Sequence, residues 1–383
     1  MKIFHAFFAV HGPSRDSDLI CLGCYDAIDE NDPDCCSDCG LPVCGRSEEK
    51  GCEKTAQHRA ECQAIRKVGR SRSLALLDDS ALLHDVVLVL RCIDLKESDP
   101  EGWEELLQLE GHLEERRSDD EVVERIERIT SFVLNDLVVE DVDPGVIERL
   151  CGALDVNSFE VPHRDGVVQA LYRRCCLAEH NCVPNLHRSF AQDLTLTFRS
   201  AIKIGANDHL TITYTDSLWT TADRRAFLAA TKYFDCMCDR CMDPTELGTN
   251  LSSLACLKCP VGAVLPNDPL DPDTEWACEA CSAAMPASTV SRVNEQAAQT
   301  LSMLEQTDPS PDQLEKFLVI HSRVLAPQHA VMVDCKHTLL HLLGQSEGLT
   351  MPDLSDKQLQ TKEELARGLI AVADKLIPGT KGC

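Results

Sequence analysis

Apolar residues recur at three- and four-residue steps over two long stretches of the chain, with charged and polar residues between them. This periodicity predicts amphipathic helices in residues 71–154 and again beyond Ser288, where prolines separate the segments. The first stripe consists of Val122, Ile126, Ile129, Val133 and Leu137, and the second of Leu314, Phe317, Leu318, His321 and Leu325.

A second pattern, in which apolar and polar residues alternate, lies between these helical stretches. Leu194, Leu196 and Phe198 alternate with polar residues, and so do Leu210, Ile212 and Tyr214. An Ile-Gly-Ala-Asn-Asp turn separates the two runs, so we expect two strands there.

Two further stretches, residues 21–62 and 236–281, show little periodicity and many cysteines. The chain of 383 residues holds 22 cysteines, many of them in pairs separated by two residues, a spacing that directs two thiolates at one metal ion. A secreted disulfide framework is the alternative, but such chains are usually short, and the apolar run in MKIFHAFFAV is brief and interrupted by His5. We therefore expect zinc ligands, and no apolar stretch approaches the ~20 residues of a membrane span.

The formal net charge of -26, concentrated in residues 97–143, makes the chain repel phosphate backbones. We therefore expect no direct binding of nucleic acid. An acidic surface suits basic protein partners, although it also serves solubility alone.

The first cysteine-rich stretch supplies seven thiolates and one imidazole, enough for two tetrahedral sites. It resembles a MYND finger, in which ligand pairs alternate between two zinc ions. The resemblance assigns one zinc to Cys21, Cys24, Cys44 and Cys52, and the other to Cys36, Cys39, His58 and Cys62. Cys35 is an alternative to Cys36, although only Cys36 has the two-residue gap to Cys39.

Three later motifs resemble those of SET-domain protein methyltransferases. Residues 179–185, Glu-His-Asn-Cys-Val-Pro-Asn, resemble the loop signature, residues 209–214 resemble the strand that ends in the catalytic tyrosine, and residues 233–241 resemble the post-SET cysteine cluster. With the finger upstream, this order resembles the SMYD family of SET and MYND domain protein-lysine methyltransferases, most closely its arthropod branch.

The resemblance implies roles for individual residues. Tyr214 would be the catalytic residue, and Asn157, His180, Asn181 and Phe234 match positions that contact S-adenosylmethionine. Without these motifs, a tyrosine at the end of a strand is usually a packed core residue, and asparagines often cap turns.

Two further metal sites follow from the remaining cysteine groups. The resemblance implies a post-SET zinc held by Cys182, Cys236, Cys238 and Cys241. A four-thiolate zinc ribbon is predicted from the spacing of Cys256, Cys259, Cys278 and Cys281. The expected total is about four zinc ions, and most of the remaining cysteines are expected to be buried free thiols. These remaining cysteines are Cys35, Cys92, Cys151, Cys175, Cys176, Cys335 and Cys383.

The expected fold is α+β, with a small β-rich SET core interrupted by the finger and a helical insert. The predicted order is a remnant of the SET N-terminal part (1–20), the MYND finger (21–62), the helical insert (63–155), the SET core (156–235), the post-SET zinc and zinc ribbon (236–288) and an all-α C-terminal region (289–383).

The sequence departs from the family pattern at both ends and in the loop signature. Only 20 residues precede Cys21, where family members carry a first SET half, the helical region stops soon after residue 379, and Glu179 replaces the signature's first asparagine. We expect a truncated core with weak or no cofactor binding.

The leading hypothesis is an S-adenosylmethionine-dependent lysine methyltransferase that acts on histones or other basic proteins, as a monomer, in nucleus and cytoplasm. The alternative is a catalytically inactive, zinc-stabilised scaffold that binds protein partners through its finger and C-terminal helices.

Overall fold

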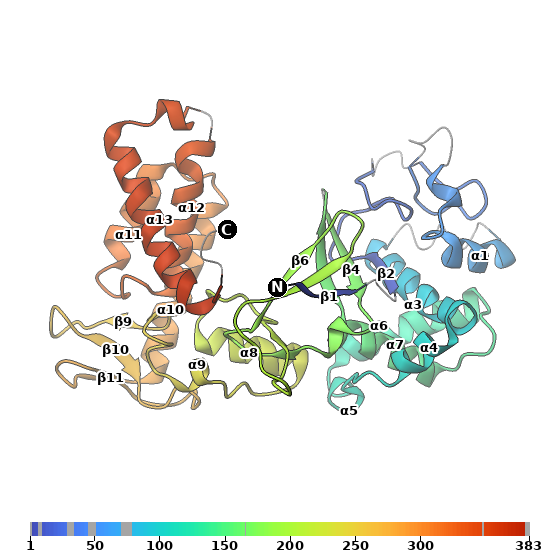
Figure 1. The fold of residues 1–383 in the computed structure, drawn as a ribbon, viewed down its shortest axis with the longest axis horizontal. Coiled ribbons are helices and arrows are strands. Elements are labelled where there is room, and N and C mark those ends of the chain that lie inside the picture. Colours follow the sequence, from blue (N-terminus) through green and yellow to red (C-terminus); the bar gives the residue numbers. More distant parts are fainter. Residues whose placement is uncertain are drawn as a thin grey trace. The chain divides into compact units, whose positions relative to one another are not determined.

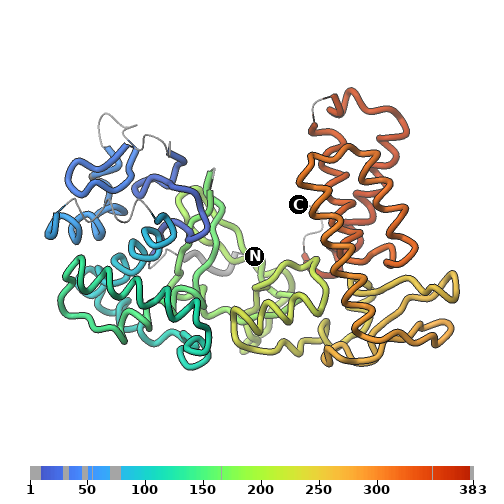
Figure 2. Tube along the Cα trace, turned by 180° about the vertical axis from the view of Figure 1, so that it is seen from behind, coloured from blue at the N-terminus to red at the C-terminus, as the bar shows by residue number. Residues whose placement is uncertain are grey.

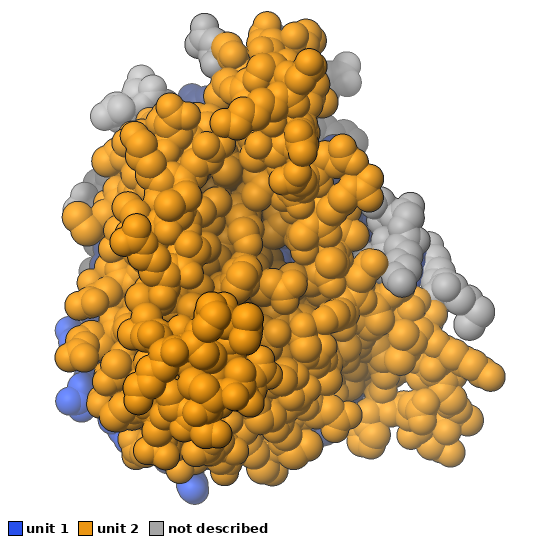
Figure 3. All heavy atoms as spheres, turned by 90° about the vertical axis from the view of Figure 1, so that its left-hand side faces the viewer, with its two compact units in different colours: residues 1–178, 188–199 blue, residues 179–187, 200–383 orange. Residues whose placement is uncertain are grey.

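The structure is a computed structural model that describes residues 2–6, 10–28, 34–44, 51–69, 79–164, 166–346 and 348–379. The chain forms two compact units, one of residues 1–178 and 188–199 and the other of residues 179–187 and 200–383 (Figure 3). Both units combine helices with short strands, which confirms the predicted α+β class.

The strands of the first unit belong to two antiparallel sheets, with strand orders β1-β7-β6 and β2-β4-β3. Strands β6 and β7 each extend a little way across the boundary into the second unit. Their bounds are β1 Lys2–Ala6, β2 Val10–Pro13, β3 Phe159–His163, β4 Gly166–Leu171, β6 Leu186–Phe190 and β7 Leu196–Ser200. Ala6 lies opposite Leu196, and Val10 lies opposite Leu171. Residues 1–20, which the sequence predicted to be a remnant of the SET N-terminal part, thus include two strands, β1 and β2. These strands pair with β7 and β4, which lie more than 150 residues further along the chain.

The two strands predicted from alternation are shorter in the structure. Leu194 is buried but adopts a left-handed φ of 62° in the turn before β7, where its carbonyl accepts a hydrogen bond from Tyr172 at 2.6 Å. β8 covers only Thr211–Ile212, and Leu210 is 42% exposed. Alternation reports which side chains are buried, and a turn can bury a side chain as well as a strand can.

Helices occupy most of the described residues of the predicted helical insert, although residues 70–78 lie outside the described residues. Its elements, with those of the finger, are η1 Cys52–Lys54, α1 Arg59–Val68, α3 Ser80–Ser98, α4 Pro100–Leu107, α5 Leu113–Arg116, α6 Asp120–Ser131, the π-helix η2 Phe132–Asp136 and α7 Pro144–Asn157 (Figure 1), and the short 3₁₀ helix η3 Cys175–Leu177 follows β4. Val133, on the predicted stripe, is fully buried in η2. The helical periodicity therefore continues past the end of α6.

Helix α3 is the centre of this unit because it is apolar almost all round. Leu83, Val86, Leu90 and Cys92 are among its buried side chains, and the cysteines of the finger belong to the same core. A Cβ atom on Gly12 of β2 would lie 2.8 Å from a Leu88 side-chain carbon, so β2 packs directly on α3.

The second unit contains the parallel pair of β5 and β8, a small zinc-ribbon sheet of order β12-β11-β10-β9, and four long helices that lie side by side (Figures 1 and 2). Its elements are β5 Glu179–His180, β8 Thr211–Ile212, α8 Thr221–Lys232, α9 Asp239–Met242, β9 Leu254–Ala255, β10 Ala263–Pro266, β11 Trp276–Cys278, β12 Ala284–Met285, α10 Ala287–Glu305, α11 Pro311–His321, α12 Ala330–Gln345, η4 Met351–Asp353 and α13 Asp356–Leu376.

One member of the second predicted stripe lies elsewhere than expected. Leu314 and Phe317 are buried on α11, as predicted, but α11 ends at His321. Leu325 instead forms an isolated bridge with Leu254 of the ribbon. A helical stripe extrapolated past the end of its helix is therefore wrong for this residue.

None of the described helices is long and apolar enough to cross a membrane. The described cysteines are all free thiols. Cys92, Cys151, Cys175 and Cys335 are buried, as predicted, and Cys176 is half-buried. Cys35 is exposed and is thus one of the remaining cysteines that burial does not explain, and Cys383 lies outside the described residues.

Candidate functional site

The four predicted sets of metal ligands come together as four separate groups in the folded chain. Within each group the ligand atoms lie within 4.8 Å of one another. Neighbouring sulfur atoms are 3.5 to 3.9 Å apart, close to the separation of about 3.8 Å between thiolates bound tetrahedrally to zinc at 2.3 Å. The donor sets and their spacing therefore fit zinc.

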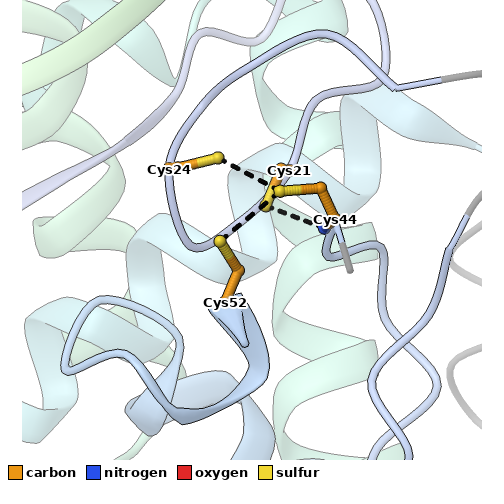
Figure 4. A group of neighbouring side chains, drawn as sticks. All are labelled: Cys21, Cys24, Cys44 and Cys52. Carbon is orange, nitrogen blue, oxygen red and sulfur yellow. Dashed lines mark hydrogen bonds between the residues drawn. The ribbon is translucent and has the colours of Figure 1, made fainter. Parts of the chain in front are cut away.

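The first finger site is formed by Cys21, Cys24, Cys44 and Cys52, whose sulfur atoms point toward one another (Figure 4). The Cys44 sulfur lies 3.5 Å from the sulfurs of both Cys24 and Cys52, and the Cys44 N–H donates to the Cys21 sulfur at 3.1 Å. Gly23 makes this approach possible, because a Cβ atom there would lie 2.7 Å from the Cys52 Cβ.

The second finger site is formed by Cys36, Cys39, His58 and Cys62, and excludes Cys35. His58 Nε2 lies 3.3 Å from the Cys39 sulfur, while His58 Nδ1 lies 3.1 Å from a carboxylate oxygen of Glu61. A proton on Nδ1 donates to this carboxylate, which leaves the Nε2 lone pair directed at the metal position. Carboxylates commonly orient metal-binding histidines in this way.

A buried ion pair connects this finger to α3. Arg91 donates to both carboxylate oxygens of Glu61, at 2.5 and 3.1 Å, and also to the Tyr25 hydroxyl at 2.6 Å and to the carbonyls of His11 and Leu22. Burial opposes ionisation of Glu61, but Arg91 holds the pKa of this carboxyl below its usual value. One guanidinium therefore supports the loops of both finger sites.

The sequence analysis missed Glu61 and Arg91. A signal for Glu61 was present, since it lies three residues after His58 and one before Cys62, at the start of the short helix α1. Arg91 gave no such signal, because it is separated from Glu61 by 30 residues.

The third site brings Cys182 of the signature loop to Cys236, Cys238 and Cys241. The Cys182 sulfur lies 3.6 Å from that of Cys241 and 3.9 Å from that of Cys236. The signature loop and the post-SET segment are thus joined at one candidate metal position.

A buried arginine lies against this third group. Arg224 of α8 donates to the sulfurs of Cys182 and Cys241, at 3.3 and 3.6 Å, and to Glu246 at 2.8 Å. Arg240 donates to the same Glu246 oxygen at 3.0 Å. Four thiolates around Zn²⁺ carry excess negative charge, which the Arg224 guanidinium partly offsets. The spacing of cysteines gave no indication of this arginine.

His180 links the third metal site to Tyr214. Its Nδ1 accepts a hydrogen bond from the Tyr214 backbone N–H at 3.1 Å, so the ring proton lies on Nε2 and is donated to the Cys182 sulfur at 3.3 Å. Burial lowers the pKa of His180 to about 4, in agreement with a neutral ring. Both ring nitrogens are therefore engaged within the protein, and the contact of His180 with a cofactor stays a prediction.

Tyr214 lies among aromatic and cationic side chains of the second unit. Its ring centroid is 5.3 Å from that of His180, and the Lys232 ammonium nitrogen lies 5.8 Å from the Tyr214 centroid. Phe234, which is 37% exposed, has its ring centroid 5.9 Å from that of His180. The structure thus groups three of the residues predicted for catalysis and cofactor binding.

The predicted asparagines have local structural contacts. The Asn181 side chain accepts from the Val183 N–H at 2.9 Å, and the Asn181 N–H donates to the Ile212 carbonyl. Asn157 belongs to the first unit, where its amide nitrogen donates to the carbonyls of Glu110 and Ala153. Their roles toward a cofactor remain predictions.

Two other residues hold the signature loop against β8. Asn185 accepts from the Thr211 N–H at 2.8 Å and donates to the His209 carbonyl at 2.7 Å. Glu179, which departs from the family signature, lies 2.8 Å from His209 Nδ1. Glu179, the first residue of the signature loop, therefore forms a polar contact with His209.

The ribbon site is formed by Cys256, Cys259, Cys278 and Cys281, and is the most exposed of the four groups. The Lys258 N–H donates to the Cys256 sulfur at 3.3 Å and lowers the pKa of Cys256 to about 6. A Cβ atom on Gly262 would lie only 2.2 Å from the Cys278 sulfur. The backbone at Gly262 thus passes directly over the metal ligands.

Comparison with known proteins identifies relatives over nearly the whole chain, although no family model matches. SmydA-8 isoform A of Drosophila melanogaster, a SET domain-containing protein, is 24% identical over 98% of this chain and 80% of its own length. The histone-lysine N-methyltransferase Smyd1 of Mus musculus is 23% identical over 50% of this chain and 42% of its own length, and the N-lysine methyltransferase SMYD2-B of Xenopus laevis is 23% identical over 54% and 50%. These relatives, found together with the four cysteine clusters, support the resemblance of this chain to the SMYD family of SET and MYND domain methyltransferases.

Proposed function

We propose that this chain is an S-adenosylmethionine-dependent protein-lysine methyltransferase whose substrates are basic protein segments, histone tails among them. The observation that carries the proposal is the connection from the post-SET cysteine cluster through His180 to the Tyr214 backbone. The lysine methyltransferase names of the Smyd1 and SMYD2-B relatives support the same reaction.

The residues near Tyr214 suit the cofactor chemically. Phe234 offers a partly exposed aromatic face beside His180, suited to stacking on an adenine ring. When bound, S-adenosylmethionine supplies an electrophilic methyl group on a sulfonium centre. Cations bind favourably to aromatic faces, and the Lys232 ammonium already lies near the Tyr214 ring.

In this proposal Tyr214 orients the lysine amine, which must be neutral to act as a nucleophile. The His180 ring holds the Tyr214 backbone and is itself held by Cys182. Because a small misplacement of reacting groups costs a large factor in rate, zinc in the third site acts on catalysis by positioning.

The net charge of -26 favours a basic substrate and disfavours nucleic acid as a direct partner. We further propose that the protein acts as a monomer in nucleus and cytoplasm, and that the finger adds protein-docking capacity.

The first test is isothermal titration of S-adenosylmethionine into folded, zinc-loaded protein, followed by a methylation assay on histone tail peptides. Under this proposal, binding with methyl transfer is the expected result, in contrast to the weak or absent binding expected from the departures of the sequence from the family pattern. No heat from protein that retains its zinc and its helical signal would overturn the proposal and favour a scaffold.

The second test is Tyr214→Phe, which removes one hydroxyl. We expect turnover to fall by about a hundredfold or more, the typical cost of losing one preorganised polar group in a site, while cofactor affinity holds. Tyr172→Phe is the matched control, because the Tyr172 hydroxyl donates to the Leu194 carbonyl inside the first unit. Equal activity of Tyr214→Phe and wild type would contradict the assigned role.

A further inference from the structure

Helix α12 carries two exposed histidines, His337 and His341, one turn apart. Their Nε2 atoms lie 3.2 Å apart, and their ring centroids are separated by 4.5 Å. Residues at this spacing are neighbours on a helix surface, so the two imidazoles converge on one position outside the helix.

The distance between the two Nε2 atoms suits a shared metal ion. Nitrogen ligands about 2.0–2.1 Å from a metal are about 2.9 Å apart at a right angle and about 3.4 Å apart in a tetrahedron. The observed 3.2 Å lies between these values. His341 Nδ1 lies 3.4 Å from the Gln345 side-chain oxygen, and a proton donated there leaves the His341 Nε2 lone pair available.

The surroundings of the pair favour a cation. Asp334, one turn before His337, interacts electrostatically with His337 and with Glu305 of α10. The Glu305 carboxylate also accepts a hydrogen bond from Thr338 at 2.7 Å. In addition, regular helical geometry in α12 ends at Leu343, and the carbonyl end of a helix attracts positive charge.

We propose that His337 and His341 form a fifth metal site, open and bidentate, for a divalent ion that prefers imidazole, such as Zn²⁺ or Ni²⁺. The groups of three or more ligands found among the described residues do not include this pair. The remaining coordination positions therefore belong to water or to a small ligand from solution. With two ligands, the site binds more weakly and exchanges faster than the four cysteine sites.

The proposal is tested by equilibrium dialysis of the full chain against Zn²⁺. The protein is first loaded with zinc and treated with a weak chelator, so that only tightly held ions remain. We expect one additional ion to bind reversibly to wild type, and His337→Ala or His341→Ala to weaken its binding by at least about tenfold. Loss of a residue that only orients a metal ligand already costs about that factor in affinity, so loss of a ligand should cost no less. His209→Ala, a change at another exposed histidine of the same unit, should leave it unchanged.

Nuclear magnetic resonance of the imidazole nitrogens supplies a second readout that does not depend on variants. Zinc addition should shift the Nε2 signals of both histidines together. Reversible binding that persists in the double variant, or Nε2 signals that do not respond to zinc, would show that the two rings form only a hydrogen-bonded pair.

Discussion

The second finger site and the ribbon site share zinc-type donor sets but differ in what surrounds them. Cys36, Cys39 and His58 are fully buried, and the buried Glu61–Arg91 pair connects them to α3. The ribbon cysteines are mostly half-buried or exposed, and the contacts around them are backbone N–H groups and the close passage of Gly262.

The two regions therefore depend on the rest of the protein to different degrees. The finger cysteines belong to the same core as α3, α4 and α7, so metal binding there is coupled to the packing of the whole first unit. The ribbon packs in a small, separate core that it shares with α10 and α12, with Leu254, Val264 and Val290 among its members. We therefore expect loss of the ribbon zinc to destabilise only the ribbon region, whereas loss of the Glu61–Arg91 pair should destabilise the whole first unit.

The largest effect is expected from Gly262→Ala. The new methyl group would overlap the Cys278 sulfur, so the ribbon should lose its zinc, whose binding is typically worth about 10 kcal/mol or more at a structural site. Elemental analysis should find one zinc fewer per chain than in wild type, while the first unit unfolds at an unchanged urea concentration.

Gly368→Ala in α13 is the matched control, because nothing lies within 4 Å of the added Cβ there. It should retain all zinc and gain up to about 1 kcal/mol of stability from helix propensity. Full zinc content in Gly262→Ala would show that the ribbon backbone can move away from its ligands.

The second prediction concerns Glu61→Gln in the finger. Glutamine keeps the shape of the side chain but leaves the Arg91 charge buried and unneutralised, so we expect a loss of about 3–5 kcal/mol in the free energy of unfolding of the first unit. Urea denaturation measures this loss, and the finger zinc should become more accessible to chelators.

Glu363→Gln is the control for Glu61→Gln, since it breaks the exposed Glu363–Arg367 pair on α13. Exposed pairs of this kind contribute at most about 1 kcal/mol. If the two variants lost equal stability, the buried pair would have no special role and the contrast between finger and ribbon would fail.

The third prediction is a pH dependence at the base of the ribbon. The Ala330 N–H donates to the Leu251 carbonyl just before the ribbon, and His329 caps α12 through Nδ1 while Nε2 donates to Asn294 at 3.2 Å. Burial lowers the pKa of His329 to about 4. Because folding disfavours the protonated ring, stability is complete above the unfolded pKa of about 6.5 and is lost as the pH falls toward 4.

We expect about 1 kcal/mol of this stability to disappear between pH 7.5 and 5.5. His329→Asn keeps a capping side chain and removes the titrating group, so its thermal stability should depend less on pH over this range. A wild-type slope no steeper than that of the variant would show that His329 does not carry the effect.

Local patterns predicted the ribbon ligands and most helices, whereas the other three ligand groups followed from the family resemblance. Cysteine pairs with a two-residue gap form the same local turn in any fold, and the stripe through Ile129 and Val133 is a property of consecutive helical turns. Alternation failed at Leu194, which is buried in a turn, and the helical stripe failed at Leu325, which is buried beyond the end of α11 in a bridge with Leu254.

The sequence by itself determined which residues are able to bind metal, which stretches form helices, and which family the chain resembles. Only the tertiary structure decided what supports each metal site: Arg91 at the finger, Arg224 at the post-SET cluster, and His180 between Cys182 and Tyr214. The physical reason is that a buried charge or hydrogen bond depends on which segments meet in space, and the pairs Arg91–Glu61, Arg224–Cys182 and His180–Tyr214 are each separated by at least 30 residues in the chain.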